Sequence, residues 1–179
     1  MNSSRAKTYY IPFILTVIVL CFDQLSKYII LATIKPWTVG YDFFNGLIRI
    51  ICVYNTGAAF SLGHTLPNIG RVLFLSIFPL TLMISISVVY FKASLSRLQR
   101  WALCGIIGGG CGNLIDRFFR QEGVVDFIDV KFFGIFGLER WPTFNIADAA
   151  IVICGFILFF TAIRNKPEKP KDNNFSAQN

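Results

Sequence analysis

VVDFIDVKFFGIFGLERWPTFNIAD, residues 124–148, carries two acids in different local settings. Asp126 lies in a run of β-branched and aromatic residues, which predicts a strand or an extended loop. Asp148 lies about one turn into an apolar stretch that continues to Ile163 and predicts a membrane helix. A carboxylate at the lip of a membrane helix is energetically expensive and indicates a functional site. Two such carboxyls brought together could share a proton and activate water.

The composition of the whole chain indicates a membrane protein of one domain. Of its 179 residues, 54% are hydrophobic, and the mean hydropathy is +0.58. Ordinary soluble domains contain about 45–50% apolar residues. The net charge of +7 comes from Lys and Arg residues in short segments between apolar blocks. In such positions they act as topology signals, so nucleic acid is not expected as a partner.

Cysteine and histidine usage argues against metal or disulfide chemistry. The single histidine, His64, excludes His-dependent triads and His-rich metal sites. None of the five cysteines belongs to a C-x-x-C pair, so neither a zinc site nor a disulfide framework is predicted. These cysteines are Cys21, Cys52, Cys104, Cys111 and Cys154. No metal and no cofactor is expected.

Four apolar blocks predict four transmembrane helices, at about residues 9–34, 70–91, 98–117 and 144–163. The first block could also be a cleaved signal peptide, but it is too long and no small-x-small cleavage site follows it. The third block contains pairs of glycines four residues apart, a pattern that lets membrane helices approach closely. These pairs are Gly105/Gly109 and Gly108/Gly112.

The two mixed segments, about residues 35–70 and 118–143, predict a small β-sheet at the membrane surface. Asn45-Gly46, flanked by apolar residues, is a strong hairpin signal. Leu47–Tyr54 then reads as a strand. The predicted fold class is therefore an all-α membrane protein with four transmembrane helices and a small extracytoplasmic sheet. One domain covers residues 1–165, and the Pro-rich, charged tail 166–179 is predicted to be disordered.

The distribution of basic residues predicts the orientation. The N-tail, the 92–100 connector and the C-tail carry nine Lys and Arg residues in about 35 positions, against seven in about 64 on the other side. The positive-inside rule then places both termini in the cytoplasm. Asp148 lies about 6 Å below the outer end of its helix at 1.5 Å per residue. Asn113 and Lys27 lie in the outer halves of their helices, so the polar groups gather near the extracytoplasmic face.

Several polar residues keep two interpretations open. Asp23 and Lys27 lie four apart on one helix face and form either a buried neutral pair or a support for a site. As such a pair, they predict that removing Asp23 leaves Lys27 as an uncompensated buried charge. Asp126 could also be an exposed strand acid, as we expect of Asp129. Asp148 could belong to a capping box begun by Asn145. Arg117 could be an interfacial anchor.

Five motifs together resemble those of the lipoprotein signal peptidases (signal peptidase II). They occur in that family's order, and the similarity covers about residues 8–165. The motifs are Asp23-Gln24-Leu25-Ser26-Lys27, Asn55-Thr56-Gly57-Ala58-Ala59-Phe60, Gly112-Asn113-Leu114-Ile115-Asp116-Arg117, Val124-Val125-Asp126-Phe127 and Phe144-Asn145-Ile146-Ala147-Asp148. The resemblance implies a four-helix aspartyl protease of the bacterial inner membrane with an extracytoplasmic β-cradle. Such enzymes cleave prolipoprotein signal peptides before a diacylglyceryl-modified cysteine.

The resemblance also implies residue roles and partners. Asp126 and Asp148 would be the catalytic pair. The residues implied to line the substrate or support the acids are Asn55, Asn113, Arg117 and Asn145, with Asp23, Lys27, Gly57 and Asp116 bracing the site. The expected partners are diacylglyceryl-modified prolipoproteins and membrane lipids, and we expect a monomer.

Two other functions compete with this interpretation. A small transporter or lipid-binding scaffold would account for Asp23 and Lys27 in the membrane, but polar groups would then be expected through its full thickness. Metal-dependent transfer of phospholipid headgroups would need several carboxylates closely spaced on helices. Asp126 and Asp148 instead lie 22 positions apart on separate predicted elements.

Overall fold

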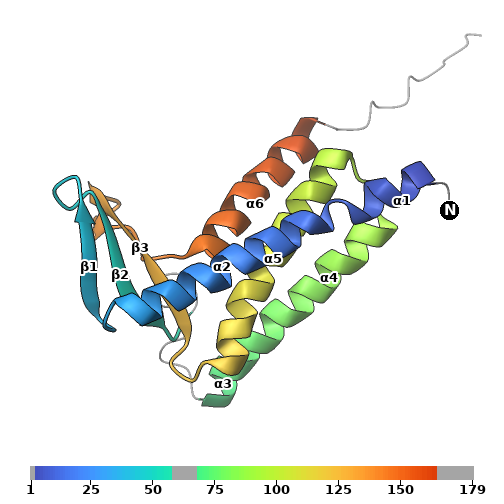
Figure 1. Cartoon of the computed structure of the whole chain (residues 1–179). Coiled ribbons are helices and arrows are strands. Elements are labelled where there is room, and N and C mark those ends of the chain that lie inside the picture. The colour runs from blue at the N-terminus through green and yellow to red at the C-terminus, as the bar shows by residue number, and fades with distance from the viewer. Residues whose placement is uncertain (1–2, 58–67, 165–179) are drawn as a thin grey trace, which may run out of the picture.

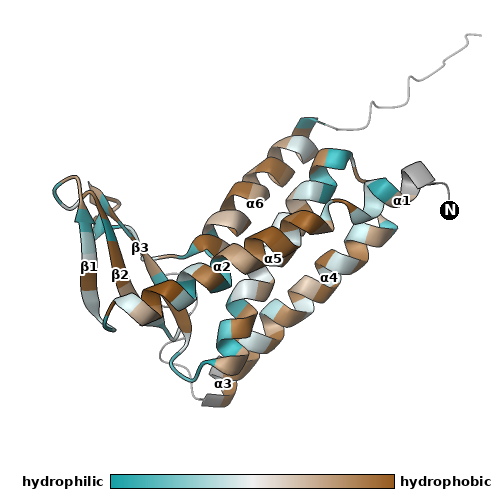
Figure 2. Cartoon of the chain, in the orientation of Figure 1, coloured by the Kyte–Doolittle hydropathy of each residue, from teal (hydrophilic) through white to brown (hydrophobic). Residues whose placement is uncertain are grey.

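The computed structural model describes residues 3–57 and 68–164 as a helical bundle with a small sheet beside one end (Figure 1). The helical segments are α1 (Ser3–Tyr10), α2 (Phe13–Thr33), α3 (Asn68–Val72), the π-helix η2 (Leu73–Ile77), α4 (Phe78–Lys92), α5 (Arg97–Phe119) and α6 (Ile146–Arg164). Within these described ranges, three helical stretches are long and apolar enough to cross a membrane: Ala6–Thr33, Leu73–Lys92 and Ile146–Arg164. Figure 2 shows apolar residues along α2 and α6.

The helix boundaries differ from the sequence prediction in three places. The second predicted helix, 70–91, is divided into α3, η2 and α4. The first predicted helix is interrupted by a turn at Ile11-Pro12 and is therefore two helices, α1 and α2. The last helix begins at Ile146, because Phe144 instead forms a β-bridge with Ile128 of the sheet. Pro79 lies at the start of α4, directly after the π-helical turns of η2, where the hydrogen-bond ladder can adjust to a missing N–H.

Helix α5 lies at the centre of the bundle and packs against α2, α4 and α6. Its glycines make this packing possible. A Cβ atom on Gly108 would lie 2.9 Å from the Thr16 carbonyl oxygen of α2, and one on Gly109 would lie 2.5 Å from the Ala147 carbonyl oxygen of α6. A Cβ atom on Gly112 would meet the carboxylate of Asp23. The close helix approach predicted from these glycines is confirmed.

The sheet is antiparallel, in the order β1 (Thr38–Phe43), β2 (Ile48–Asn55), β3 (Val124–Ile135) and β4 (Leu138–Arg140). Asn45 and Gly46 form the β1–β2 turn with φ of 53° and 82°, so the hairpin predicted from Asn-Gly is confirmed. The sheet joins the bundle through an apolar cluster at the end of α2. Its buried members are Ile30, Ile34, Cys52, Val125 and Phe127.

A buried arginine ties the other end of the bundle together. Arg100 of α5 donates a hydrogen bond to the carbonyl oxygen of Tyr90 in α4 (2.8 Å), and its guanidinium lies 3.9 Å from the ring centroid of Tyr9 in α1. The Tyr90 hydroxyl in turn donates to the Tyr9 carbonyl oxygen (2.5 Å). Arg100, counted above as a topology signal, therefore also packs inside the protein, where it is 4% exposed.

Candidate active site

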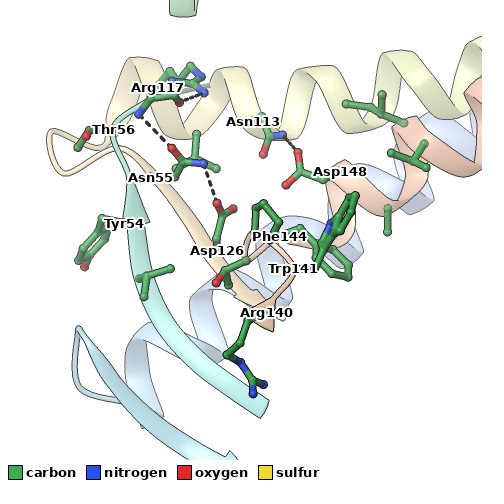
Figure 3. A pocket seen from close by; sticks show the side chains of 18 of the residues that line it. Tyr54, Asn55, Thr56, Asn113, Arg117, Asp126, Arg140, Trp141, Phe144 and Asp148 are labelled. Carbon is green, nitrogen blue, oxygen red and sulfur yellow. Dashed lines mark hydrogen bonds between the residues drawn. The ribbon is translucent and has the colours of Figure 1, made fainter. Parts of the chain in front are cut away.

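Asp126 and Asp148 line one cavity of about 1400 Å³ between the sheet and the ends of α5 and α6 (Figure 3). Asp126 comes from β3, and Asp148 comes from the first turn of α6. The structure thus brings together two acids that the sequence places on separate elements. Of the residues implied as supports, Asn55, Gly57, Asn113 and Arg117 line the same cavity.

Asp126 is nearly inaccessible to solvent and is held by two side-chain amides. Its Oδ2 accepts a hydrogen bond from Asn55 Nδ2 (2.9 Å), and its Oδ1 accepts one from Asn145 Nδ2 (2.7 Å). Burial raises the pKa of Asp126 to about 7, and the negative charge of Asp148 adds to the rise, while the two amide hydrogen bonds oppose it. The carboxyl can therefore take up or release a proton near neutral pH.

Asp148 forms both the capping box and one wall of the cavity. Its Oδ2 accepts from the backbone N–H of Asn145 (3.2 Å), and Asn145 Oδ1 accepts from the backbone N–H of Asp148 (3.0 Å). This reciprocal pair caps the start of α6. The other oxygen, Oδ1, accepts from Asn113 Nδ2 (2.7 Å). The capping interpretation is correct. The capping bonds hold the Asp148 carboxyl at the cavity, so capping and a role in the site are compatible.

Asn113 connects Asp148 to Asn145 and Lys27 and has a defined orientation. Its Oδ1 accepts hydrogen bonds from Lys27 Nζ (3.0 Å) and from Asn145 Nδ2 (3.1 Å). Because an ammonium group can only donate, the amide oxygen of Asn113 faces Lys27 and its NH₂ group faces Asp148. Asn145 reaches both Asp126 and Asn113, so one network of amides spans the pair of carboxyls.

A cluster of buried charges lies directly behind the cavity. The ammonium of Lys27 lies 2.8 Å from carboxylate oxygens of both Asp23 and Asp116, and all three side chains are fully buried. Arg120 contacts Asp116 from the other side (2.9 Å). The interpretation of Asp23 and Lys27 as a neutral pair is correct but incomplete. Removing Asp23 would not leave Lys27 uncompensated as expected, because Asp116 also contacts it.

The charged cluster is also connected to the start of α6. Asp23 Oδ1 accepts from the backbone N–H of Ala147 (3.0 Å), the residue before Asp148. Gln24 donates to the carboxylates of Asp23 (3.2 Å) and Asp116 (3.2 Å) and to the carbonyl oxygen of Gly112 (3.1 Å). Sequence reasoning gave Gln24 no role, although it lies inside the first of the five motifs. The cluster thereby fixes where α6 begins.

Arg117 is connected to Asp126 through the backbone of Gly57. Its Nη2 donates to the carbonyl oxygen of Gly57 (2.8 Å). The N–H of Gly57 donates to Asn55 Oδ1 (3.0 Å), and Asn55 in turn donates to Asp126. Arg117 also lines the cavity.

The expectation that Asp129 is an exposed acid is wrong. Asp129 is 6% exposed and pairs with Nε of Arg140, at 2.6 Å and 2.7 Å for its two oxygens. Arg140 lines the cavity, as do Trp37, Trp141 and Tyr54, and the sequence analysis singled out none of them as a site residue. An interfacial Arg-Trp-Pro run just before a membrane helix was the available signal for Arg140 and Trp141.

The family profile and the similar proteins point to one family. The profile described as "Signal peptidase (SPase) II" matches residues 15–164. A lipoprotein signal peptidase of Treponema denticola is 52% identical over 95% of this chain and 99% of its own length, and one of Treponema pallidum is 50% identical over 90% and 88%. A solved bacterial membrane enzyme is 29% identical, with a TM-score of 0.74 over 91% of this chain and 97% of that chain.

Proposed function

The chain belongs to the signal peptidase II family, and we propose that Asp126 and Asp148 are the catalytic pair of this aspartic protease. The enzyme removes signal peptides from prolipoproteins. The observation that supports the assignment is that both carboxyls line one cavity and are held there by amides. Within residues 3–57 and 68–164, neither carboxyl forms an ion pair.

The proposed chemistry needs one proton shared by the two carboxyls. Two close carboxyls do not both ionise readily, so near neutral pH one is ionised and one is protonated. The ionised carboxyl takes a proton from water, and the water oxygen attacks the scissile carbonyl carbon. The protonated carboxyl gives its proton to the carbonyl oxygen. When the tetrahedral intermediate collapses, its C–N bond breaks and the carboxyl that took a proton from water gives it to the leaving amine. The other carboxyl takes a proton back from a hydroxyl of the intermediate. The two titrations belong to the pair rather than to either residue.

The amide groups provide positioning in this scheme. The NH₂ groups of Asn55, Asn113 and Asn145 donate to the carboxyls, which supports the charge without neutralising it. Arg117 lines the cavity and contacts Gly57 near Asn55, where a substrate carbonyl or the peptide backbone could be bound. Asp23, Lys27, Asp116 and Gly57 brace these groups from behind.

We also propose four membrane spans. They are the three apolar stretches Ala6–Thr33, Leu73–Lys92 and Ile146–Arg164, together with α5. Helix α5 is less apolar than α2, α4 and α6 because it carries glycines and part of the polar site, but it lies packed among them. Both termini are then cytoplasmic, and the cavity opens near the extracytoplasmic face of the inner membrane. Residues 1–165 form one domain, and the enzyme acts as a monomer. The predicted tail 166–179 lies outside the described residues.

The substrate we propose is a prolipoprotein with a diacylglyceryl-modified cysteine, cleaved just before that residue. The cavity wall formed by α6 is apolar and includes Ile151, Val152 and Ile153. Val152 and Ile153 are also more than half exposed on the outside of the helix, where lipid would lie. The acyl chains could therefore remain in the bilayer while the peptide bond reaches the carboxyls.

The test is cleavage by Asp126→Asn and Asp148→Asn variants. Each change keeps the shape of the side chain but removes its acid–base function, so each should lower turnover of a diacylglyceryl-modified prolipoprotein by about 10²-fold or more. Asp42→Asn is the matched control, because Asp42 pairs with Arg49 on the outer part of the sheet. Asp129 is unsuitable as a control since it holds Arg140 at the cavity. Near-normal turnover of a folded Asp126 or Asp148 variant would exclude that residue as catalytic.

A further inference from the structure

Two neighbouring hairpins at one end of the sheet present a set of exposed apolar side chains. The β1–β2 turn lies next to the base of the β3–β4 hairpin, because the N–H of Lys131 donates to the Leu47 carbonyl oxygen (2.8 Å) and Arg140 donates to the Gly46 carbonyl oxygen (3.0 Å). The side chains that project there are Phe43, Phe44, Phe133, Ile135 and Phe136, which are 46%, 78%, 65%, 50% and 89% exposed. We call these five residues the apolar tip.

The apolar tip lies beside the active-site cavity, since Leu138, which pairs with the tip residue Ile135, lines that cavity. Strand pairing puts Asn55 opposite Val124 near Asp126, whereas Ile48 and Val130 pair at the end that carries the tip. None of the five tip residues lines the cavity. Figure 1 shows the sheet projecting sideways from the helices, with the β1–β2 turn at its upper left, away from the bundle. The proposed catalysis assigns no role to these five exposed apolar side chains.

The backbone at the tip has a conformation that bulky residues rarely adopt. Phe44, Phe133 and Phe136 have φ of 54°, 56° and 53°. This left-handed region normally holds Gly, Asn or Asp. Phenylalanine at three such turn positions is locally unfavourable, and its side chains stay mostly exposed in the described chain. The exposed rings are therefore available for a contact outside the described chain.

We propose that the apolar tip is an anchor that inserts into the interfacial layer of the membrane that the chain itself spans. Apolar side chains are also exposed on the outside of the bundle, where Phe22 of α2 and Ile153 of α6 are exposed to 60% and 59%. Aromatic residues are favoured at the membrane–water boundary. Lys131 places its ammonium 5.4 Å from the ring centroid of Phe133, where a cation can meet lipid phosphates.

The anchor would hold the sheet close to the bilayer beside α6. The mouth of the cavity would then stay level with the acyl chains of a membrane-bound substrate. This consequence rests on the proposed function, whereas the insertion of the tip does not. The two ideas can therefore fail separately.

The depth of the tip can be measured with a spin label at position 136. Phe136→Cys is made in a Cys21→Ser/Cys111→Ser background, in which the remaining Cys52, Cys104 and Cys154 are buried. Glu122→Cys is the matched control, because Glu122 is exposed in the turn between α5 and β3. In nanodiscs of phosphatidylcholine and phosphatidylglycerol, the label at 136 should be relaxed mainly by oxygen and the label at 122 mainly by a water-soluble nickel chelate. Equal access of the chelate to both labels would overturn the proposal.

A second copy of the chain is the other occupant to be tested. If the label at 136 is shielded only in discs that hold two copies, the tip is a protein contact and the proposal is wrong. The Phe133→Ser/Phe136→Ser variant gives a functional reading. Its cleavage rate should match that of the unaltered enzyme in detergent, while KM in bilayers should rise severalfold. An unchanged KM in bilayers would contradict the anchor without affecting the assignment of Asp126 and Asp148.

Discussion

Two pairs of buried carboxyls lie side by side in this protein and differ in what surrounds them. Asp23 and Asp116 both contact the ammonium of Lys27 at 2.8 Å. Asp126 and Asp148 form no ion pair within the described ranges and are held by amides instead. The first pair is thus held by a cation, whereas the second is held by neutral amide donors. We therefore infer a structural role for the first pair and proton exchange for the second.

The two pairs are coupled through one amide. Asn113 accepts from Lys27 with its oxygen and donates to Asp148 with its NH₂ group. Asp23 holds the backbone of Ala147, next to Asp148. The Lys27-bound pair thus positions the proposed catalytic pair, and changes in one should be visible in the other.

The largest stability effect should come from removing the shared cation. Lys27→Met leaves Asp23 and Asp116 buried without their ammonium, so the free energy of unfolding should fall by about 3–5 kcal/mol. Asp23→Asn should lower it by clearly less, because Asp116 still contacts Lys27. Melting curves in detergent check the order. If both variants melt at the same temperature, Lys27 is not the centre of the cluster.

Removing charge from the proposed catalytic pair should raise the free energy of unfolding rather than lower it. Burial raises the pKa of Asp126 to about 7 from 3.8, so between about pH 4 and pH 7 the folded state holds a proton that the unfolded chain has lost. Stability therefore falls as pH rises through this range. Asp126→Asn should be neutral near pH 4 and stabilising above pH 7, by at most about 4 kcal/mol.

The measurement is the difference in unfolding midpoint between the variant and the unaltered protein at about pH 4.5 and pH 8. Asp42→Asn is the control, because its effect on stability should change with pH in the opposite direction. The hydrogen bond from Arg49 lowers the pKa of Asp42, so its carboxylate stabilises the fold only when ionised. If Asp126→Asn raises the unfolding midpoint equally at both pH values, the raised pKa of Asp126 is contradicted.

A smaller effect should follow from widening the contact between α5 and α6. A Cβ atom on Gly109 would lie 2.5 Å from the Ala147 carbonyl oxygen, so Gly109→Ala should cost about 1–3 kcal/mol and move Asp148 away from Asn113. Gly155→Ala is the control, because nothing lies within 4 Å of its Cβ position. Melting and cleavage should both fall for Gly109→Ala and neither for Gly155→Ala. Full activity with a lowered melting point would show that the site tolerates the displacement.

Local signals predicted most of the elements from sequence. Asn45-Gly46 predicted the hairpin, and the glycine spacing of residues 105–112 predicted the close approach of α5 to its neighbours. The helix ends were predicted less well. The turn at Ile11-Pro12 and the β-bridge of Phe144 interrupt the helices, and the length of an apolar block indicates neither. Three of the predicted helices are long and apolar enough to span a membrane, and the count of four remains a prediction.

The site was less visible in the sequence than the fold. The spacing of Asn145 and Asp148 fits a cap and a site equally well, and the structure shows that one carboxyl has a cap contact on one oxygen and a cavity contact on the other. Asp116 and Arg140 contact residues 89 and 11 positions away, and no local pattern indicates such contacts. The motif resemblance, rather than periodicity, pointed to Asn55 and Asn113.

The pH dependence of kcat/KM for prolipoprotein cleavage tests the central claim most directly. If Asp126 and Asp148 act with one shared proton, kcat/KM should fall about tenfold per pH unit above roughly pH 7, where Asp126 loses its proton. The same decline should appear in Asp42→Asn, whose carboxyl lies outside the cavity. A rate that stays constant from about pH 5 to pH 9 would contradict the assignment of this pair as the catalytic acid and base.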